Sequence, residues 1–210
     1  MSKVQGIVLE VAALTPRITA LRVGAQDGTP LEDFDAGAHI EFDLPTGGTR
    51  AYSLIRLEQA ESAPSHYQIA VQREDDGEGG SRYMHSLSVG DPVVFSAPKN
   101  DFPLDISAPA VLVAGGIGVT PMISMASALR AAGQSVSMTF AGRSRSEMAY
   151  CDELQALLSN DLRLHCDDES GLLDLDAVIA GLGDAHLYVC GPRPMIEAAR
   201  TKAETAGIAQ

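Results

Sequence analysis

The amino-acid sequence predicts a small antiparallel β-barrel of six strands followed by a doubly wound α/β domain with a parallel sheet. Short β-branched runs separated by turn residues fill positions 4–95, and strand and helix patterns alternate from residue 111 onward. A proline-containing segment, Ala97–Leu104, joins the two patterns. We place the boundary near Ile106, which gives domains of residues 1–106 and 107–210.

The first half carries the strand signal. Its alternating runs are separated by turn residues such as Asp27-Gly28 and Pro45-Thr46-Gly47-Gly48. Six closely spaced strands predict the barrel, and a short helix is expected at Arg82–Leu87. The expected strands are Ile7–Leu14, Ile18–Val23, His39–Leu44, Ala51–Ile55, Tyr67–Gln72 and Pro92–Phe95.

The second half alternates strands with helices after an opening apolar strand that begins at Val111. Ligands bind a doubly wound sheet beyond the carboxyl ends of its strands, where Gly115–Thr120, Gly142–Ser146 and Cys190–Pro192 fall. The further expected strands are Ser135–Ala141, Leu162–Cys166 and Ala185–Cys190, and the expected helices are Pro121–Ala132, Ser146–Leu158, Asp174–Ala180 and Pro192–Ala206.

The glycine-rich turn after the opening strand is the centre of the second half. It contains Gly115, Gly116 and Gly118. We expect Thr120 to cap the next helix and Pro121 to be its first residue. Glycines let a ligand approach the backbone closely, and a helix N-terminus offers unpaired N–H groups to an anion. A tight strand-to-helix turn without a ligand is the alternative.

A second motif, Arg50-Ala51-Tyr52-Ser53-Leu54, lies on an expected strand. Because side chains alternate along a strand, Arg50 and Tyr52 share one face. A guanidinium can hold a phosphate by a bidentate contact while the ring lies against a flat heterocycle, and Ser53 offers a hydroxyl nearby. The alternative is an exposed arginine and a half-buried tyrosine on an ordinary strand.

Two shorter motifs follow strands. The N–H groups of Gly79-Gly80-Ser81, at the start of a short helix, can form a phosphate nest, with a hairpin turn as the alternative. Cys190-Gly191-Pro192 joins the last strand to the last helix, and Met195 lies one turn further. Taken alone, Cys190 is a small buried hydrophobic side chain.

Charged residues follow the second and third strands of the α/β half. The run Gly142-Arg143-Ser144-Arg145 lies where a dinucleotide fold meets the adenosine ribose. Its two arginines can hold the extra phosphate of NADPH, stack on adenine or lie in solvent. We interpret Asp167-Asp168-Glu169 as a solvated loop rather than a metal site, and we predict no metal.

Composition narrows the class of partner. A formal net charge of -13 argues against nucleic acid and anionic membranes, because phosphates attract Lys and Arg. The stretch Met1–Gly6 lacks a signal-peptide core, and no apolar run is long enough to span a bilayer. The three cysteines are widely scattered, which argues against a disulfide framework. We therefore expect a cytoplasmic protein.

In their order along the chain, Arg50–Leu54, Gly79–Ser81, Gly115–Thr120 and Cys190–Met195 resemble the ferredoxin–NAD(P) reductase superfamily. Within it they are most similar to the FMN-containing reductases of the phthalate dioxygenase reductase type. The resemblance covers nearly the whole chain and implies a flavin-binding β-barrel domain followed by an NAD(P)-binding α/β domain.

The resemblance also implies roles for single residues. Arg50 would contact the flavin phosphate, Tyr52 would pack on the isoalloxazine, and Ser53 would lie near its reactive N5. Gly79-Gly80-Ser81 implies FMN, but Glu78 stands where FMN-binding relatives commonly carry an arginine, so FAD stays open.

On the dinucleotide side, Cys190 would lie beside the nicotinamide as a positioning residue. The Arg-Ser-Arg run of residues 143–145 also occurs in NADH-using relatives, so the resemblance favours NADH over NADPH.

The function that the resemblance implies is a flavin-dependent NAD(P)H oxidoreductase, the reductase component of an oxygenase system. NADH would donate hydride to FMN, and electrons would pass singly to a separate acceptor protein, an oxygenase or a ferredoxin. Three scattered cysteines cannot ligate the iron–sulfur cluster of larger relatives, so we expect a two-domain reductase or one without its electron-exit domain. The alternatives are a non-catalytic, flavin-holding electron-transfer subunit and a nucleotide-binding regulatory module without flavin.

Overall fold

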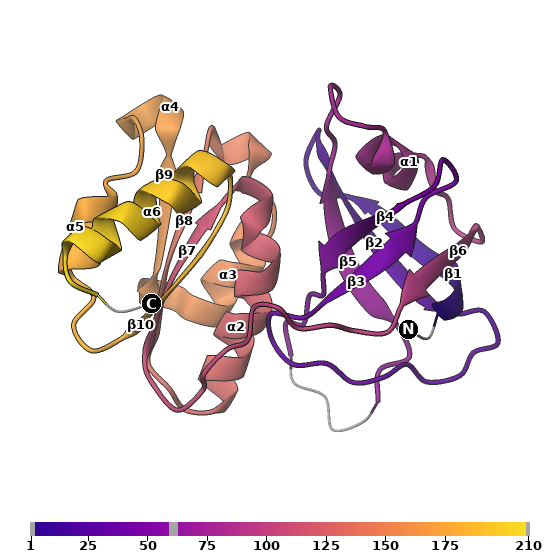
Figure 1. Ribbon diagram of the computed structural model, residues 1–210, viewed down its shortest axis with the longest axis horizontal. Helices are drawn as coiled ribbons and strands as arrows, with labels where there is room; N and C mark the ends of the chain where they lie inside the picture. The colour runs from indigo at the N-terminus through magenta and orange to yellow at the C-terminus, as the bar shows by residue number, and fades with distance from the viewer. Residues whose placement is uncertain (1–2, 59–62, 209–210) are drawn as a thin grey trace. The chain divides into compact units, whose positions relative to one another are not determined.

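The computed structural model describes residues 3–58 and 63–208 (Figure 1). The first two residues of Met1–Gly6 lie outside the described residues, as do the last two of the chain. The chain divides into two compact units, Met1–Leu104 and Asp105–Gln210. The first unit is built on an antiparallel sheet and the second on a parallel sheet.

The sheet of the first unit has six strands in the order β4-β3-β6-β1-β2-β5. Just beyond β4, the Ile55 N–H donates to the Gln68 carbonyl on β5 at 2.8 Å, so the two ends of the sheet meet. A short helix, α1, follows β5. The elements are β1 (Lys3–Ala13), β2 (Ile18–Ala25), β3 (His39–Asp43), β4 (Thr49–Ser53), β5 (Tyr67–Gln72), α1 (Gly80–Ser86) and β6 (Pro92–Ser96).

The inward side chains of these strands form one core. Phe42, Tyr67 and Phe95 are fully buried, and their rings pack in a row with centroids 5.6 Å apart for Phe42–Phe95 and 5.9 Å for Tyr67–Phe95. The Tyr67 hydroxyl donates to the Glu32 carbonyl at 2.6 Å, which satisfies its polar end. Strand β4 ends at Ser53 rather than Ile55. The Leu54 N–H still donates to the Ala38 carbonyl, in register just beyond β3, but the Ile55 N–H leaves β3 for the Gln68 carbonyl of β5.

The sheet of the second unit has four parallel strands in the order β10-β7-β8-β9. Helices α2 and α3 cover one face, and α5 and α6 cover the other (Figure 1). Among the described residues, none of the helices is long and apolar enough to cross a membrane. The elements are β7 (Ala110–Gly115), α2 (Val119–Ala131), β8 (Val136–Gly142), α3 (Cys151–Leu158), β9 (Leu162–Cys166), α4 (Asp167–Ser170), α5 (Leu175–Ala180), β10 (His186–Cys190) and α6 (Arg193–Thr205), with 3-10 turns at Gly116–Gly118, Arg145–Glu147 and Ser159–Asp161.

The strand order changes direction beside β7, because β8 lies on one side of it and β10 on the other. Cys190 at the end of β10 is in register with Ala114 near the end of β7. The turns that follow these two strands therefore start side by side, at the position where doubly wound sheets bind ligands.

Two expectations for this unit are wrong in detail. The helix expected over Ser146–Leu158 is helical as α3 only from Cys151, because buried Tyr150 takes a left-handed backbone with φ 64° that an α-helix cannot accommodate. The loop expected at Asp167–Glu169 is a short helix, α4, whose Gly171 N–H closes the turn on the Asp167 carbonyl.

Candidate functional site

The first unit brings two of the sequence motifs together. On β4, Arg50 is in register with Phe42 and Tyr52 with Ile40, so Arg50 and Tyr52 share the face that contacts the core. The start of α1 lies against this face, since a Cβ added to Gly80 would be 2.9 Å from the Arg50 Cγ. Only glycine permits this approach, and the two motifs form one site.

The Arg50 guanidinium already has partners in this site. Its Nη1 donates to the Thr49 carbonyl at 2.9 Å, and its Nη2 forms an ion pair with the Glu78 carboxylate. The side chain of Glu78 is 85% exposed and that of Arg50 is 40% exposed. The resemblance singled out Glu78 because FMN-binding relatives commonly carry an arginine there, but a direct contact between residues 28 positions apart could not be read from the sequence.

Tyr52 is half-buried and packs edge-on against Phe42, with ring centroids 5.9 Å apart. Burial raises the pKa of the Tyr52 hydroxyl to about 12, which keeps it protonated at neutral pH. Ser53 lies opposite His39, on the other face of the strand, and Ala51 is exposed.

The loop that precedes α1 is held by Ser81. The Ser81 hydroxyl accepts from the Glu74 N–H at 2.9 Å and therefore braces residues 74–81. Gly79 adopts the left-handed region with φ 95° at the N-cap of α1. The Ser81 hydroxyl is thus engaged with the loop backbone, and the phosphate nest expected from the N–H groups of Gly79-Gly80-Ser81 stays a prediction.

The second unit joins the other two motifs backbone against backbone. A Cβ on Gly118 would lie 2.3 Å from the Cys190 carbonyl oxygen. A Cβ on Gly115 would lie 2.6 Å from the Met195 sulfur and 2.8 Å from the Pro192 Cδ. The turn after β7 and the turn after β10 are thus in direct contact, and the glycines are required for that contact.

The expected helix cap at Thr120 is wrong. The 3-10 turn Gly116–Gly118 continues directly into α2, which begins at Val119 with Gly118 as its N-cap. The buried Thr120 hydroxyl donates to the Ile117 carbonyl at 3.0 Å instead of accepting from a helix N–H. Pro121 is the third helical residue, where a backbone N–H would have no intrahelical partner in any case.

The remaining predicted residues of this unit differ in exposure. Cys190 is half-buried, and burial raises the pKa of its thiol, so it is neutral at physiological pH. Arg143 and Arg145 are exposed, and an Arg145 Nη lies 3.7 Å from an Asp152 carboxylate oxygen. The Ser144 and Ser146 hydroxyls are 3.1 Å apart in the same loop.

One cluster of possible metal ligands was not predicted. Cys166, Asp168 and Glu169 each place a ligand atom within 4.8 Å of the others. Burial and the carboxylates of Glu169 and Asp168 raise the pKa of the Cys166 thiol, and its Sγ lies 3.9 Å from the Met148 sulfur. A protonated thiol is a poor ligand, and both carboxylates are exposed.

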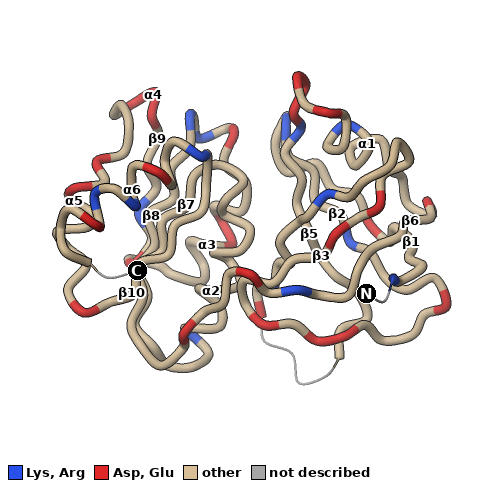
Figure 2. Tube along the Cα trace, in the orientation of Figure 1, with Lys and Arg blue, Asp and Glu red and all other residues tan. Residues whose placement is uncertain are grey.

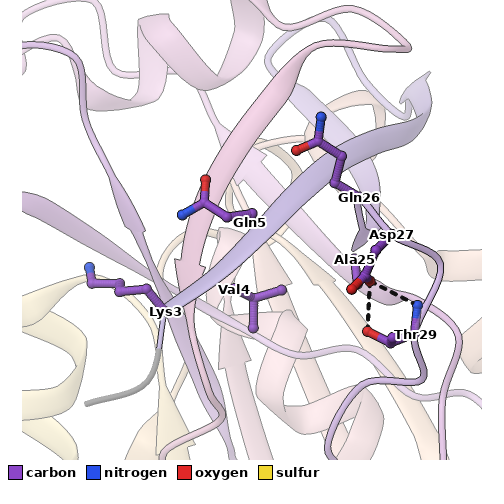
Figure 3. Close-up of a pocket in the computed structure, with 7 residues that line it drawn as sticks. All are labelled: Lys3, Val4, Gln5, Ala25, Gln26, Asp27 and Thr29. Atoms are coloured by element: carbon purple, nitrogen blue, oxygen red, sulfur yellow. Dashed lines mark hydrogen bonds between the residues drawn. The ribbon is translucent and has the colours of Figure 1, made fainter.

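An open concavity in the first unit lies apart from the predicted residues (Figure 3). Its volume is about 490 Å³, and it lies at the start of β1 and the end of β2. The Thr29 hydroxyl and N–H both donate to one Asp27 carboxylate oxygen, at 2.8 and 3.0 Å. Its lining consists of Lys3, Val4, Gln5, Ala25, Gln26, Asp27 and Thr29.

Comparison with known proteins identifies related oxidoreductases. A family model described as "Oxidoreductase NAD-binding domain" matches residues 112–201. The chain is 44% identical over 183 residues to the phenoxybenzoate dioxygenase subunit beta of Ectopseudomonas oleovorans, covering 85% of this chain and 55% of that protein. It is 39% identical over 180 residues to the phthalate dioxygenase reductase of Burkholderia cepacia, covering 82% and 55%.

Solved structures show the same similarity. Phthalate dioxygenase reductase superposes with a TM-score of 0.87 at 33% identity, covering 97% of this chain and 64% of that one. A type IV self-sufficient cytochrome P450 monooxygenase superposes with a TM-score of 0.89 at 32% identity, covering 96% and 26%. The chain therefore spans little more than half the length of the curated relatives named here.

These findings give the chain a ferredoxin reductase-like fold with an oxidoreductase NAD-binding domain in its second unit. The chain is a homologue of phthalate dioxygenase reductase and of other reductase subunits of oxygenase systems. The predicted fold class and the resemblance drawn from the motifs are confirmed.

Proposed function

We propose that this chain is the flavin- and NAD(P)H-binding part of an oxygenase reductase, which takes electrons from NADH and passes them to a separate oxygenase or ferredoxin. One observation carries the proposal: each unit assembles two distant motifs into one site, Arg50 with Gly80 and Gly118 with Cys190. The names of the homologous reductase subunits support the same reaction.

The first unit fits a flavin nucleotide. Arg50 supplies a guanidinium at the start of α1, where Gly80 lets the arginine side chain approach the backbone closely, and this suits a phosphate. Tyr52 supplies a half-buried ring for the flat ring system, and Ser53 supplies a hydroxyl on the next position. When bound, the flavin would accept electron pairs from NADH and release electrons one at a time. We propose FMN, with Gly79, Gly80 and Arg50 at its phosphate.

The second unit fits a dinucleotide. The turn of Gly115, Gly116 and Gly118 leads into the N-terminus of α2, which offers N–H groups to the pyrophosphate. Arg143, Ser144 and Arg145, at the carboxyl end of β8, would contact the adenosine portion.

The turn after β10 would orient the nicotinamide. Cys190 presents a neutral thiol there, and Gly191, Pro192 and Met195 complete the packing against Gly115. A neutral, half-buried side chain positions the ring without exchanging protons with it, so we assign Cys190 a role in orientation. We propose NADH as the physiological donor.

The absorption spectrum of the purified chain, followed anaerobically as NADH is added, tests the proposal. We expect a flavin spectrum that bleaches with NADH, FMN as the flavin released by heat, and reduction of ferricyanide. A flavin that NADH does not bleach would indicate the non-catalytic electron-transfer subunit, and a colourless protein that binds no added flavin would indicate the regulatory module. FAD as the sole released flavin would contradict the FMN assignment alone.

A further inference from the structure

The arginine that the proposed function assigns to the flavin phosphate is already paired within the protein. The Arg50 Nη2 donates to the Glu78 carboxylate, and Nη1 donates to the Thr49 carbonyl at 2.9 Å. Glu78 lies two residues before Gly80, which itself touches the Arg50 side chain. A carboxylate therefore occupies N–H donors that a phosphate at this site would use.

The other acidic residues of this loop have different environments. The loop between β5 and α1 carries four carboxylates within five residues, Glu74, Asp75, Asp76 and Glu78 (Figure 2). An Asp75 oxygen accepts from the Arg73 Nε at 2.7 Å, and an Asp75 oxygen is 3.9 Å from an Arg17 Nη. Among the described residues, Glu78 is the carboxylate that forms an ion pair with Arg50.

The charge of the phosphate determines how strongly Glu78 opposes flavin binding. A phosphate monoester has a second pKa of about 6, so it carries nearly two negative charges at neutral pH. It must displace the Glu78 carboxylate from Arg50 or bind beside it, and either event opposes binding. Riboflavin carries no phosphate and is not subject to this competition.

We infer that Glu78 competes with the flavin phosphate for Arg50 and thereby sets the affinity of the site for phosphorylated flavins. This inference rests on the proposed function, because it requires a flavin phosphate at Arg50. Glu78 is thus a specificity-determining residue: it lowers the advantage of FMN over riboflavin and makes the bound FMN more readily exchangeable. Its side chain is 85% exposed, so its replacement leaves the fold intact.

The test is a fluorescence titration of the full-length, flavin-free protein with FMN and with riboflavin, at low and at high salt. Glu78→Gln should tighten FMN binding about tenfold at low salt and less at high salt, because charge interactions at the surface are screened. Riboflavin binding should stay within about twofold, since no phosphate charge is involved. Asp76→Asn is the matched control, and it removes one charge from the same loop with an expected gain below about threefold.

A double variant separates competition from general repulsion. In an Arg50→Ala background, Glu78→Gln should improve FMN binding by less than about twofold, because there is no guanidinium left to release. A full gain in that background overturns the inference, as does an equal gain from Asp76→Asn or an equal gain for riboflavin. If the wild type binds both flavins and Glu78→Gln does not change either affinity, the inference is wrong but the proposed flavin site is not contradicted. If neither the wild type nor the variant binds flavin, the proposed function fails together with the inference.

Discussion

The two sites of this protein are built in opposite ways. The site in the first unit depends on side chains at the surface, with the Arg50 charge balanced by an exposed Glu78. The site in the second unit depends on main chain, with Gly118 against the Cys190 carbonyl and Gly115 against Met195 and Pro192. Surface charges can change without disturbing the packing, whereas a turn that touches another turn accepts no added atom.

This difference indicates where specificity can vary. If the first site holds a flavin phosphate as proposed, one exposed substitution would change its affinity, because solvent accommodates the new side chain. The site in the second unit offers no such freedom at its centre, since tight packing converts any added atom into strain. Substitutions in the two sites should therefore differ in both size and kind of effect.

Gly118→Ala should have the largest effect. The new Cβ would lie 2.3 Å from the Cys190 carbonyl oxygen, so the turn after β7 or the turn after β10 must move. We expect a loss of about 3 kcal/mol in the free energy of unfolding of the second unit, and reduction by NADH slowed at least about a hundredfold. Thermal unfolding and stopped-flow reduction measure the two effects.

Gly181→Ala is the control for that variant. A Cβ at Gly181 would lie 3.6 Å from the Ala177 carbonyl oxygen, an ordinary contact, and the backbone there has φ -88°. It should leave stability and the rate of reduction nearly unchanged, and both variants should retain flavin. Normal reduction by Gly118→Ala would show that the two turns can separate without consequence.

Arg50→Ala should have the next largest effect, and it acts on affinity rather than on folding. Loss of a charge-assisted phosphate contact is worth about 1.5–3 kcal/mol, or about 10- to 150-fold in the dissociation constant of FMN. Because Glu78 competes with the phosphate for this guanidinium in the wild type, the lower part of that range is expected. Arg22→Ala, an exposed arginine of β2 that pairs with Glu10, is the control. An unchanged FMN dissociation constant in Arg50→Ala would remove the arginine from the site.

The sequence predicted the elements better than it predicted the contacts. The six strands of the first unit and the parallel order of the second follow from local hydrophobic period and from turn residues, which a single sequence displays. The start of α2 was missed because a 3-10 turn feeds into it, and Thr120 then fell inside the helix. The left-handed backbone of Tyr150 has no local signal, since tertiary packing holds a non-glycine residue there.

The candidate residues show the same limit. The motifs indicated which side chains matter, but the partners of those side chains came from elsewhere in the chain. The Arg50–Glu78 ion pair and the hydrogen bond from the Glu74 N–H to the Ser81 hydroxyl both depend on how the loop between β5 and α1 folds. No rule of residue spacing predicts that fold. The placement of FMN and NADH on these residues stays a prediction.

A smaller effect concerns alkaline pH and distinguishes the buried tyrosine from the exposed charges around it. Burial raises the pKa of Tyr52 from 10.0 to about 12, so the unfolded chain loses this proton before the folded chain does. The stabilisation is complete below pH 10 and is lost as the pH rises toward 12. Between pH 9 and pH 11 the wild type should lose about 1 kcal/mol of its free energy of unfolding through this tyrosine. Tyr52→Phe should not show that loss when both proteins are unfolded with urea in the absence of flavin. An identical pH profile for the wild type and the variant would contradict this assignment.

The smallest effect should come from the two exposed arginines of the second unit. Arg143 and Arg145 lie at the surface, and Arg145 is partly balanced by Asp152 at 3.7 Å. Exposed charge contacts contribute little, so Arg143→Ala and Arg145→Ala should change the dissociation constant of NADH by less than about threefold. The dissociation constant of NADPH should rise more than that of NADH, because the additional phosphate of NADPH can bind a guanidinium. Arg163→Ala, on β9, serves as the control for loss of one positive charge. A tenfold or larger loss of NADH affinity would mean that these arginines contribute strongly to holding the adenosine portion, and the second site would then share the side-chain character of the first.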